Sequence, residues 1–269
     1  MLITHFTNAK SFLLSHTSKS NSFSLEINCL KDGQAAFAQY KSQKGYMILN
    51  LRKFTTSVLT NTNRQPEGYY YQWDELIGKT VNGRYGIVEQ LGKITDAWYI
   101  CIRDGKQYKL TGTVTNAAID QTQKLLLHNV KITFAYTGLD SQFMFSYPDG
   151  KVSSPNFSSL DAEGLARSCY IKDYNFDGYD DIAFSIADAG MGVYQNFDIW
   201  LYEPNTKRFG PLKESQDPRA KCSGLCEVSI NARQKLFFTA CRGGARWWQD
   251  VYRFGKNNQL IWLRSSEKK

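Results

Sequence analysis

Short runs of alternating or aromatic-rich residues recur along most of the chain, and each run is bounded by residues that favour turns. They extend from about residue 22 to residue 264, and the spacing typical of amphipathic helices is almost absent. Strands are expected at 24–29, 34–40, 46–51, 84–90, 97–102, 107–113, 131–136, 142–147, 181–186, 197–202, 227–230, 235–241, 249–254 and 259–264. The sequence therefore predicts an all-β protein.

The turns between these runs are spaced at similar intervals over much of the chain. Gly105, Gly150, Asn205 and Asn257 follow one another at intervals of 45, 55 and 52 residues. About four strands fit into each interval, as in a propeller blade, and the length of 269 residues divides into about five blades. We therefore expect a five-bladed β-propeller-like fold, with two β-sandwich-like units as the alternative. The interval of 72 residues from Gly33 to Gly105 indicates that the first blades are irregular or carry an insertion.

The expected domain organisation is simple. Residues 1–21 are polar and are expected to form a leader, and residues 22–269 are expected to form one domain, with a subdivision near residues 70–77 as an option. Hydrophobic residues make up 42% of the chain, which is enough for a packed core and argues against long disorder. No apolar run approaches the roughly 18 residues that a membrane-spanning helix needs, so no membrane span is expected.

Charge is unevenly distributed along the chain. The net charge is +8, but residues 161–199 carry −6 and the remainder carries +14. Lysines and arginines elsewhere occur singly among the expected strands, without a basic run or a nucleic-acid-binding motif. We therefore expect a solvated basic surface and no nucleic-acid partner.

The few histidines argue against common hydrolytic enzymes. The chain contains only His5, His16 and His128, and the first two lie in the expected leader. A Ser/His/Asp or Cys/His site would therefore have to be built around His128, which follows an apolar run and is typical of a strand end. Phosphate-binding glycine loops and metalloprotease motifs are also missing. We expect a protein without catalytic activity.

The six cysteines bear on the compartment. An even number fits disulfide bonds in an oxidising environment, and the last three, Cys222, Cys226 and Cys241, could contain one bridge, although the sequence alone gives no connectivity. Cys222 and Cys226 have no second Cys or His pair at zinc-finger spacing, so a structural zinc site is not expected. The chain begins without the pattern of a signal peptide, which fits either a cytoplasmic protein or a mature chain whose signal peptide has been removed.

The most specific motif is an acidic loop, D-Y-N-F-D-G-Y-D-D, at residues 173–181. Its oxygen-bearing residues occupy the alternate positions of a calcium loop, and glycine stands at the sixth position, where a sharp turn is needed. The predicted calcium ligands are the side chains of Asp173, Asn175, Asp177 and Asp181 and the main-chain carbonyl of Tyr179. A cation is expected because carboxylates this close together repel one another.

The ending of this loop differs from that of an EF-hand. The twelfth position, which in an EF-hand holds a bidentate glutamate, is Phe184, and an apolar strand pattern follows instead of a helix. We therefore expect calcium to have a structural role, since the sequence offers no partner base for a catalytic metal.

The motif and its surroundings resemble a known bacterial family. The loop is followed by the segments G-M-G-V-Y at 190–194 and F-D-I-W-L-Y at 197–202, and it is preceded by N-G-R-Y-G-I-V at 82–88, A-W-Y at 97–99 and K-L-T-G at 109–112. Over roughly residues 77–264 this pattern resembles periplasmic lysozyme-inhibitor-like immunity proteins, which have a calcium-loop β-propeller and are found beside secretion systems that deliver peptidoglycan-cleaving toxins. The resemblance implies a periplasmic location and a cognate peptidoglycan hydrolase as partner.

The resemblance also implies a mechanism of inhibition. A loop of the inhibitor would enter the glycan cleft of a muramidase, where a tyrosine hydroxyl would meet the catalytic carboxylic acid. Tyr194 is the best positional match, and Gly190 and Gly192 would give its loop the freedom to turn tightly. Tyr174 and Tyr179, which flank the predicted metal ligands, are the secondary candidates.

Two other functions remain open at this point. Trp247 and Trp248 are candidates for a sugar-stacking platform in a carbohydrate-binding or peptidoglycan-binding module, although aromatic residues entering a strand more often serve packing. A glycosidase would use a pair of the acidic residues between positions 161 and 198. The sequence does not predict the oligomeric state.

Overall fold

The computed structural model describes residues 9–18, 22–43, 45–57, 68–115, 122–135, 143–155, 166–187 and 194–268. In these residues the chain is all-β, as predicted, and every expected strand segment overlaps an observed strand. The chain divides into two compact units. The first unit comprises residues 7–135 and 144–153, and the second comprises residues 1–6, 136–143 and 154–269.

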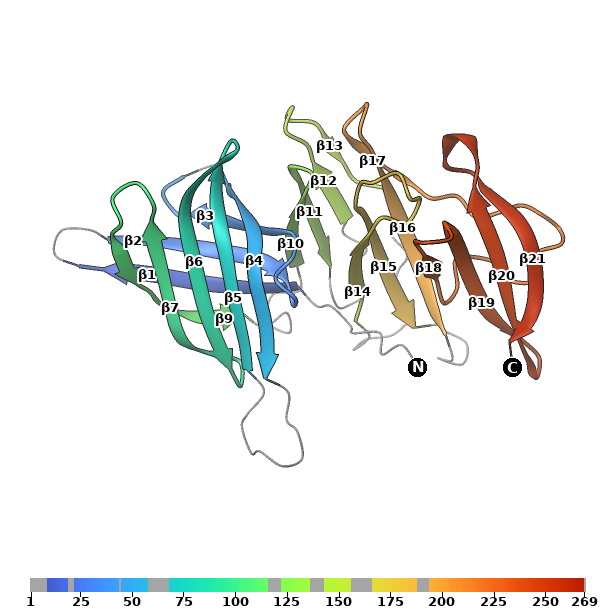
Figure 1. Ribbon diagram of the computed structural model, residues 1–269, viewed down its shortest axis with the longest axis horizontal. Helices are drawn as coiled ribbons and strands as arrows, with labels where there is room; N and C mark the ends of the chain where they lie inside the picture. Colours follow the sequence, from blue (N-terminus) through green and yellow to red (C-terminus); the bar gives the residue numbers. More distant parts are fainter. Residues whose placement is uncertain are drawn as a thin grey trace. The chain divides into compact units, whose positions relative to one another are not determined.

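One nine-stranded antiparallel sheet dominates the first unit (Figure 1). Its strands run in the order β8-β7-β6-β5-β4-β3-β2-β1-β9, so that neighbours in sequence are mostly neighbours in the sheet. The strands are β1 (Ala9–Thr17), β2 (Ser22–Leu30), β3 (Ala36–Tyr40), β4 (Met47–Ser57), β5 (Gly68–Ile77), β6 (Thr80–Gln90), β7 (Lys93–Cys101), β8 (Gln107–Lys109) and β9 (Thr111–Thr115).

The sheet ends in β8 on one side and in β9 on the other, and these two strands are nearly continuous in the chain. Only Leu110 separates β8 from β9, and its N–H donates to the carbonyl oxygen of Ala97 on β7 at 2.8 Å. β8 pairs with β7, and β9 pairs with β1, where Leu14 lies opposite Gly112. The segment from 107 to 115 therefore bridges both ends of the sheet and nearly closes it, which leaves few unpaired edges.

The inner face of this sheet is filled with aromatic side chains. Phe12, Tyr71, Trp73 and Tyr85 are fully buried, and the rings of Tyr71 and Trp73 stack with their centroids 5.2 Å apart. Trp73 and Tyr71 lie on alternate positions of β5, as expected for residues that face one side of a strand. Gly83 makes room for the inward-facing ring of Tyr99 from β7, because a Cβ atom there would collide with that ring. Side chains thus form a packed core inside the sheet.

Two boundary predictions are wrong. Residues 9–17 of the expected polar leader form β1, where Phe12 is fully buried and Leu14 is 2% exposed. The alternation of these apolar residues with polar ones is what a strand with one buried face requires. The suggested subdivision at residues 70–77 falls inside β5, in the middle of the nine-stranded sheet.

Three four-stranded antiparallel sheets follow in the chain. The first contains β10 (Thr122–Leu127), β11 (Val130–Ala135), β12 (Phe143–Ser146) and β13 (Val152–Ser153). The second contains β14 (Ser168–Lys172), β15 (Asp181–Ala187), β16 (Gln195–Glu203) and β17 (Arg208–Pro211), and the third contains β18 (Ser229–Asn231), β19 (Leu236–Gly243), β20 (Arg246–Phe254) and β21 (Leu260–Lys268). The last two sheets share one core, which includes Ile199, Leu201, Phe237 and Tyr252.

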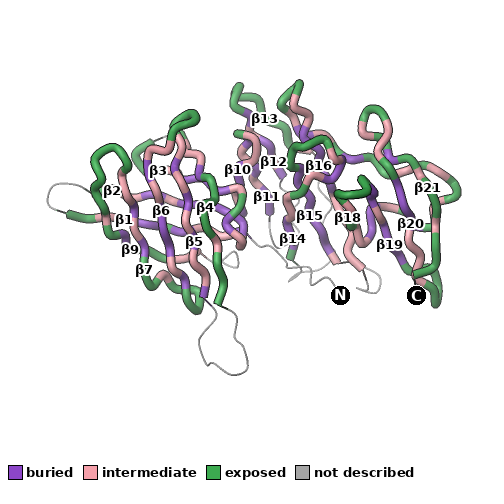
Figure 2. The backbone as a smooth tube through the Cα atoms, in the orientation of Figure 1, coloured by how far each residue is buried: buried purple, intermediate pink, exposed green. Residues whose placement is uncertain are grey.

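Recurring aspartate–glycine turns connect several hairpins. In the turns at Asp32, Asp104 and Asp149, the carboxylate accepts the N–H of the residue two positions later, and the intervening glycines have positive φ angles of 83°, 66° and 81°. This is the turn chemistry expected from the sequence. Figure 2 shows the consequence: hairpin tips are exposed, whereas the middle of most strands is buried.

The number of four-stranded sheets differs from the expected number of blades. Residues 122–268 contain three such sheets, each with the strand content of a blade, but residues 9–115 form one continuous sheet. Strands of 9–11 residues, with β5, β6 and β7 joined by two-residue turns, pair side by side in this region without the break that ends a blade. Within the residues that the structure describes, the only helical segment is the short 3₁₀ turn η1 (Lys256–Asn258), and no helix is long and apolar enough to cross a membrane.

Candidate functional site

The acidic loop connects β14 to β15 in the second unit. Two of its residues need the left-handed backbone region: Gly178 has φ 92° and Phe176 has φ 64°. Glycine adopts such angles without steric cost, whereas Phe176 must be held there by its surroundings. Its ring meets that of Phe254 edge-on, with the centroids 6.1 Å apart. Packing and the glycine together give the loop its tight shape.

The carboxylates of the loop accept hydrogen bonds from the loop's own main chain. The N–H groups of Asp177 and Gly178 donate to the two oxygens of Asp173 at 3.1 and 2.9 Å. The N–H of Tyr179 donates to Asp177 at 2.9 Å, and the Asn175 side-chain amide donates to the other oxygen of Asp177 at 2.9 Å. These bonds fix the backbone from residue 173 to residue 179.

Asp181 is buried beneath the loop and has a different set of partners. It is fully buried, and its two oxygens accept the N–H groups of Tyr174 at 2.9 Å and Tyr202 at 2.8 Å. Burial raises the pKa of Asp181 to about 7, against the lowering effect of these two N–H groups. Negative charge on Asp177 and Asp173 contributes to this raised pKa. Asp181 therefore ties the start of the loop to β16.

The chemistry of these ligand candidates fits a hard cation in part. All are oxygen donors, the kind that Ca²⁺ prefers, and each carboxylate oxygen keeps a second lone pair beside its hydrogen bond. Across the described ranges, however, no three His, Cys, Asp or Glu side chains are placed to hold a metal ion. A calcium ion would therefore also need the Asn175 side chain and the carbonyl of Tyr179, and the carboxylates would have to turn inward.

The two tyrosines of the loop have opposite environments. Tyr174 is 2% exposed and belongs to the core shared by the last two sheets, and burial raises its pKa. Its side chain lies inside the core, so the interpretation of Tyr174 as a residue on the partner-facing rim is wrong. Tyr179 is 43% exposed, and its ring lies 5.9 Å from that of Tyr202. Tyr179 is thus the loop tyrosine that a partner can reach.

Tyr194 precedes β16 and lies outside this loop. It is half-buried, contacts Trp247 edge-on at 6.4 Å and packs against a cluster of Cys222, Cys226 and Cys241. Gly190 and Gly192, the predicted hinge positions before it, lie outside the described residues. Tyr194 thus packs on Trp247 and the cysteine cluster, whereas the acidic loop is tied to β16 and packs on Phe254.

The cysteine cluster beside Tyr194 contains the one disulfide among the described residues. Cys222 and Cys241 are bonded, and their Cα atoms lie 5.5 Å apart. This confirms the prediction of one bridge among the last three cysteines. The thiol of Cys226 donates to the carbonyl oxygen of Ser223 at 3.1 Å, and Cys226, like Cys29, Cys101 and Cys169, is outside any disulfide bond.

The nine-stranded sheet contains two buried carboxylates that the sequence analysis missed. Glu75 is 1% exposed and accepts hydrogen bonds from Asn82, from Tyr85 at 2.7 Å and from Tyr99 at 3.3 Å. Glu89 is 3% exposed and forms an ion pair with Lys10 at 2.6 Å. The sequence contained a signal for the burial of Glu75, because Glu75 continues the alternate positions of β5 that face inward. Both carboxylates are paired, which is the structural role expected of buried charges.

The tryptophan pair is less open than a sugar-stacking platform requires. Trp248 packs against the cysteine cluster, and the Lys221 ammonium lies 5.7 Å from the centre of its ring. Trp247 is half-buried and contacts Tyr194.

In comparisons with known proteins, no protein-family model and no curated sequence matches the chain.

Proposed function

We propose that this protein binds and inhibits a peptidoglycan-degrading muramidase and has no catalytic activity of its own. The observation that carries the proposal is the acidic loop, which presents an exposed tyrosine on a backbone fixed by internal hydrogen bonds. A loop that is ordered before binding loses little conformational entropy when it enters a cleft. The proposal takes the four-stranded sheets as blade-like units, and the loop belongs to the sheet of β14, β15, β16 and β17.

In this proposal the hydroxyl of Tyr179 meets the catalytic acid of the target. Muramidases of this kind need a protonated carboxylic acid in the glycan cleft, and a hydroxyl placed against it would occupy the position of the glycosidic oxygen. Tyr179 is favoured over Tyr194 because it is 43% exposed, whereas Tyr194 is half-buried against Trp247 and the cysteines. Tyr194 remains a candidate for contacts at the edge of the interface.

Calcium is the proposed structural ion of the loop. Asp173, Asn175, Asp177, Asp181 and the carbonyl of Tyr179 would supply oxygen ligands, and the ion would offset repulsion among the carboxylates. Calcium titration of metal-free protein should raise its melting temperature, and Asp177→Asn should reduce this shift. Magnesium provides the ion control. An unchanged melting temperature with calcium would remove the metal from the proposal and leave the tyrosine mechanism to be tested separately.

A periplasmic location is the proposed setting. The Cys222–Cys241 disulfide supports it, because such bonds persist in oxidising compartments and are rare in the cytosol. The cognate partner would be a secreted hydrolase encoded by a neighbouring gene.

The test is an inhibition assay on purified peptidoglycan. The hydrolase is assayed alone, with a stoichiometric amount of this protein, and with its Tyr179→Phe variant, which lacks only the hydroxyl. Tyr70→Phe, on β5 of the nine-stranded sheet, is the matched control. We expect inhibition by the wild type and the control and at least about tenfold weaker inhibition by Tyr179→Phe, the factor that one hydrogen bond to a charged or acidic group provides. Undiminished hydrolysis with the wild type would refute the proposal.

Carbohydrate binding is the second candidate function, and it would use the part of the half-buried Trp247 ring that stays exposed beside Tyr194. Aromatic side chains stack on sugar rings, and Trp247 retains part of its surface. A carbohydrate-binding module should bind peptidoglycan fragments directly when no hydrolase is present. Trp247→Ala should abolish that binding, whereas Tyr179→Phe should leave it unchanged.

A further inference from the structure

The last sheet of the second unit ends in a long strand with a free edge. β21 pairs with β20 along one side, and it is the outermost strand in the order β18-β19-β20-β21. Among the described residues, no main-chain hydrogen bond joins residues 261–268 to a segment other than β20. In an antiparallel sheet, alternate residues of such a strand point their N–H and C=O groups away from the sheet. The free edge of β21 can therefore take up another strand.

The pairing register sorts the side chains of β21 between the two faces of this sheet. Tyr252 lies opposite Trp262, and both pack in the core that the last two sheets share. Because side chains alternate between the faces of a strand, the neighbouring pair of Arg253 and Ile261 lies on the outer face. One face of the sheet is thus covered by the preceding sheet, and the other face lies on the outside.

The outer face combines exposed apolar side chains with positive charge. Ile261 is 49% exposed, and Leu263, the extra residue of a bulge beside it, is 37% exposed. The outer-face positions of the four strands also include four exposed cations, Arg242, Arg253, Arg264 and Lys268, and none of these positions holds Asp or Glu. An added strand would therefore cover apolar surface and meet positive charge.

Charge decides which kind of strand fits this edge. A second copy of β21, paired antiparallel about Ser266, would bring Arg264 of each chain opposite Lys268 of the other, and like charges in such pairs are destabilising. Acidic side chains at the same positions would instead form cross-strand ion pairs with Arg264 and Lys268. On the inner face the added side chains would lie beside Trp262, which favours apolar residues there.

We propose that β21 binds an extended segment of a partner protein as a fifth strand of this sheet, and that acidic and apolar residues alternate in this segment. Main-chain hydrogen bonds to the free edge would supply affinity, and the acidic residues beside Arg264 and Lys268 would supply specificity. The alternation in the segment follows from the two-residue period of side chains along a strand. The site lies on a different sheet from the acidic loop, and the inference is independent of the proposed function.

The probe is a short fluorescein-labelled peptide in which glutamate and valine alternate, and its binding to the whole chain is followed by fluorescence anisotropy. We expect saturable binding. A peptide with lysine in place of glutamate tests the charge. A peptide with proline in place of the central valine tests the pairing, because proline keeps the charge but cannot donate a main-chain hydrogen bond. Both should bind at least about tenfold more weakly than the first peptide.

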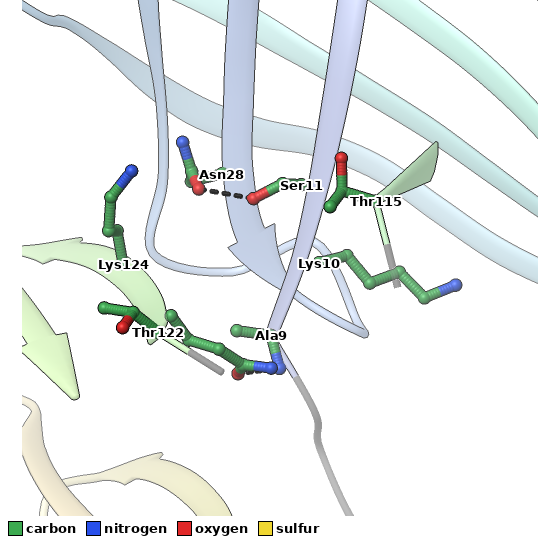
Figure 3. A pocket seen from close by; sticks show the side chains of 8 residues that line it. Ala9, Lys10, Ser11, Asn28, Thr115, Thr122 and Lys124 are labelled. Atoms are coloured by element: carbon green, nitrogen blue, oxygen red, sulfur yellow. Dashed lines mark hydrogen bonds between the residues drawn. The ribbon is translucent and has the colours of Figure 1, made fainter. Parts of the chain in front are cut away.

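Arg264→Glu is the decisive variant of the protein, because this exposed position can change without disturbing the core. It should weaken binding of the acidic peptide at least about tenfold, since repulsion replaces attraction. Lys124→Glu, on β10 of the first unit (Figure 3), makes the same change in net charge outside the last sheet and should bind like the wild type. Circular dichroism of both variants should match that of the wild type.

Several outcomes would overturn the inference. Absence of a saturable signal with the acidic peptide would mean that the edge of β21 does not bind such a strand. Equal binding of the proline peptide would mean charge attraction without strand pairing, and equal weakening by Lys124→Glu would mean general electrostatics. Vesicles of phosphatidylglycerol provide the comparison with a membrane. Vesicle binding that is lost in Arg264→Glu, together with no binding of the peptide, would assign the outer face to a lipid surface instead.

Discussion

The two units of the molecule satisfy their buried carboxylates in different ways. In the nine-stranded sheet, the partners of Glu75 and Glu89 are side chains: tyrosine hydroxyls, an amide and the Lys10 ammonium. In the second unit, the partners of Asp181 and Asp250 are mainly main-chain N–H groups, three of them in connecting segments and one, that of Tyr202, in β16. The difference follows from sheet closure.

A nearly closed sheet uses its main-chain N–H groups in strand pairing, so an inward-facing carboxylate must find donors on other side chains. Short four-stranded sheets leave long connections whose N–H groups have no strand partner. Asp250 accepts two of these, from Lys221 and Cys222, at 2.9 and 2.8 Å. Buried acids thus fix side-chain packing in the first unit and loop paths in the second, and the acidic loop is one of those loops.

The largest effect is expected at the ion pair of the first unit. Glu89→Leu would leave the Lys10 ammonium, on a side chain only 15% exposed, without its partner. Breaking a buried pair in this way lowers the free energy of unfolding by about 4 kcal/mol, and the double variant Lys10→Met/Glu89→Leu should recover most of the loss. Hydrogen exchange followed by mass spectrometry would measure the change in stability of each unit separately. Equal destabilisation of both units would contradict the separation of their polar networks.

The disulfide offers the corresponding test in the second unit. Cys222 and Cys241 are 19 residues apart, and closing a loop of this size stabilises a folded chain by about 3 kcal/mol. Cys222→Ser/Cys241→Ser should therefore increase hydrogen exchange in residues 194–268 and leave the nine-stranded sheet unchanged. Cys226→Ser, which removes the neighbouring thiol and keeps the bridge, is the control. Faster exchange in β1–β9 would show that the bridge also supports the first unit.

The strands were predictable where one face is buried and turn residues mark the ends. The Asp-Gly turns at Gly33, Gly105 and Gly150 formed as expected, because their glycines take positive φ angles. β5 was missed since Tyr69, Tyr70 and Tyr71 place aromatic rings on both of its faces, which hides the alternation. β1 was missed because serine, lysine and histidine between its apolar residues read as a polar leader.

The extent of each sheet could not be read from local pattern. The same hairpins build a four-stranded sheet or a nine-stranded one, and the choice depends on pairing between distant strands, such as β1 with β9. The 72-residue interval before Gly105 was the signal that the first region differs from the later ones. The spacing of the acidic loop likewise identified its residues, but the burial of Tyr174 and the exposure of Tyr179 depend on packing against β16 and the core.

Asp250→Ala tests whether a buried aspartate fixes the path of a loop. Its expected effect is smaller than that of breaking the ion pair or the disulfide. Asp250 is fully buried, and the substitution would remove the acceptor for the N–H groups of Lys221 and Cys222 and for the hydroxyl of Ser265. The free energy of unfolding of the second unit should fall by about 2 kcal/mol. Asp250→Asn, which keeps one oxygen, should lose less.

The control for this prediction is Glu267→Ala, which removes an exposed carboxylate paired with Arg246. Exposed ion pairs contribute little, so the stability of the second unit should hardly change. Melting followed by circular dichroism compares the variants. A loss in Glu267→Ala as large as that in Asp250→Ala would mean that net charge, and not the capping of loop N–H groups, produces the effect.

The smallest effect is expected at the edge of the tyrosine network in the nine-stranded sheet. Tyr85 has one hydroxyl hydrogen and donates it to Glu75, so at the 2.6 Å contact between the hydroxyls Tyr40 must be the donor. Burial raises the pKa of Tyr40 to about 12, which keeps this hydrogen in place at neutral pH. Tyr40→Phe should therefore lower the free energy of unfolding by about 1 kcal/mol, the usual contribution of one hydrogen bond.

Tyr46→Phe is the matched control for Tyr40→Phe, because its hydroxyl donates to the carbonyl oxygen of Asn129 at an exposed position where water can replace it. Tyr46→Phe should lower the free energy of unfolding less than Tyr40→Phe does, when both are measured by urea unfolding. If the two losses were equal, the hydroxyl of Tyr40 would be acting like a surface group. The side-chain network around Glu75 would then end at Tyr85. The contrast between side-chain partners in the first unit and main-chain partners in the second would then depend only on the direct partners of Glu75 and Glu89.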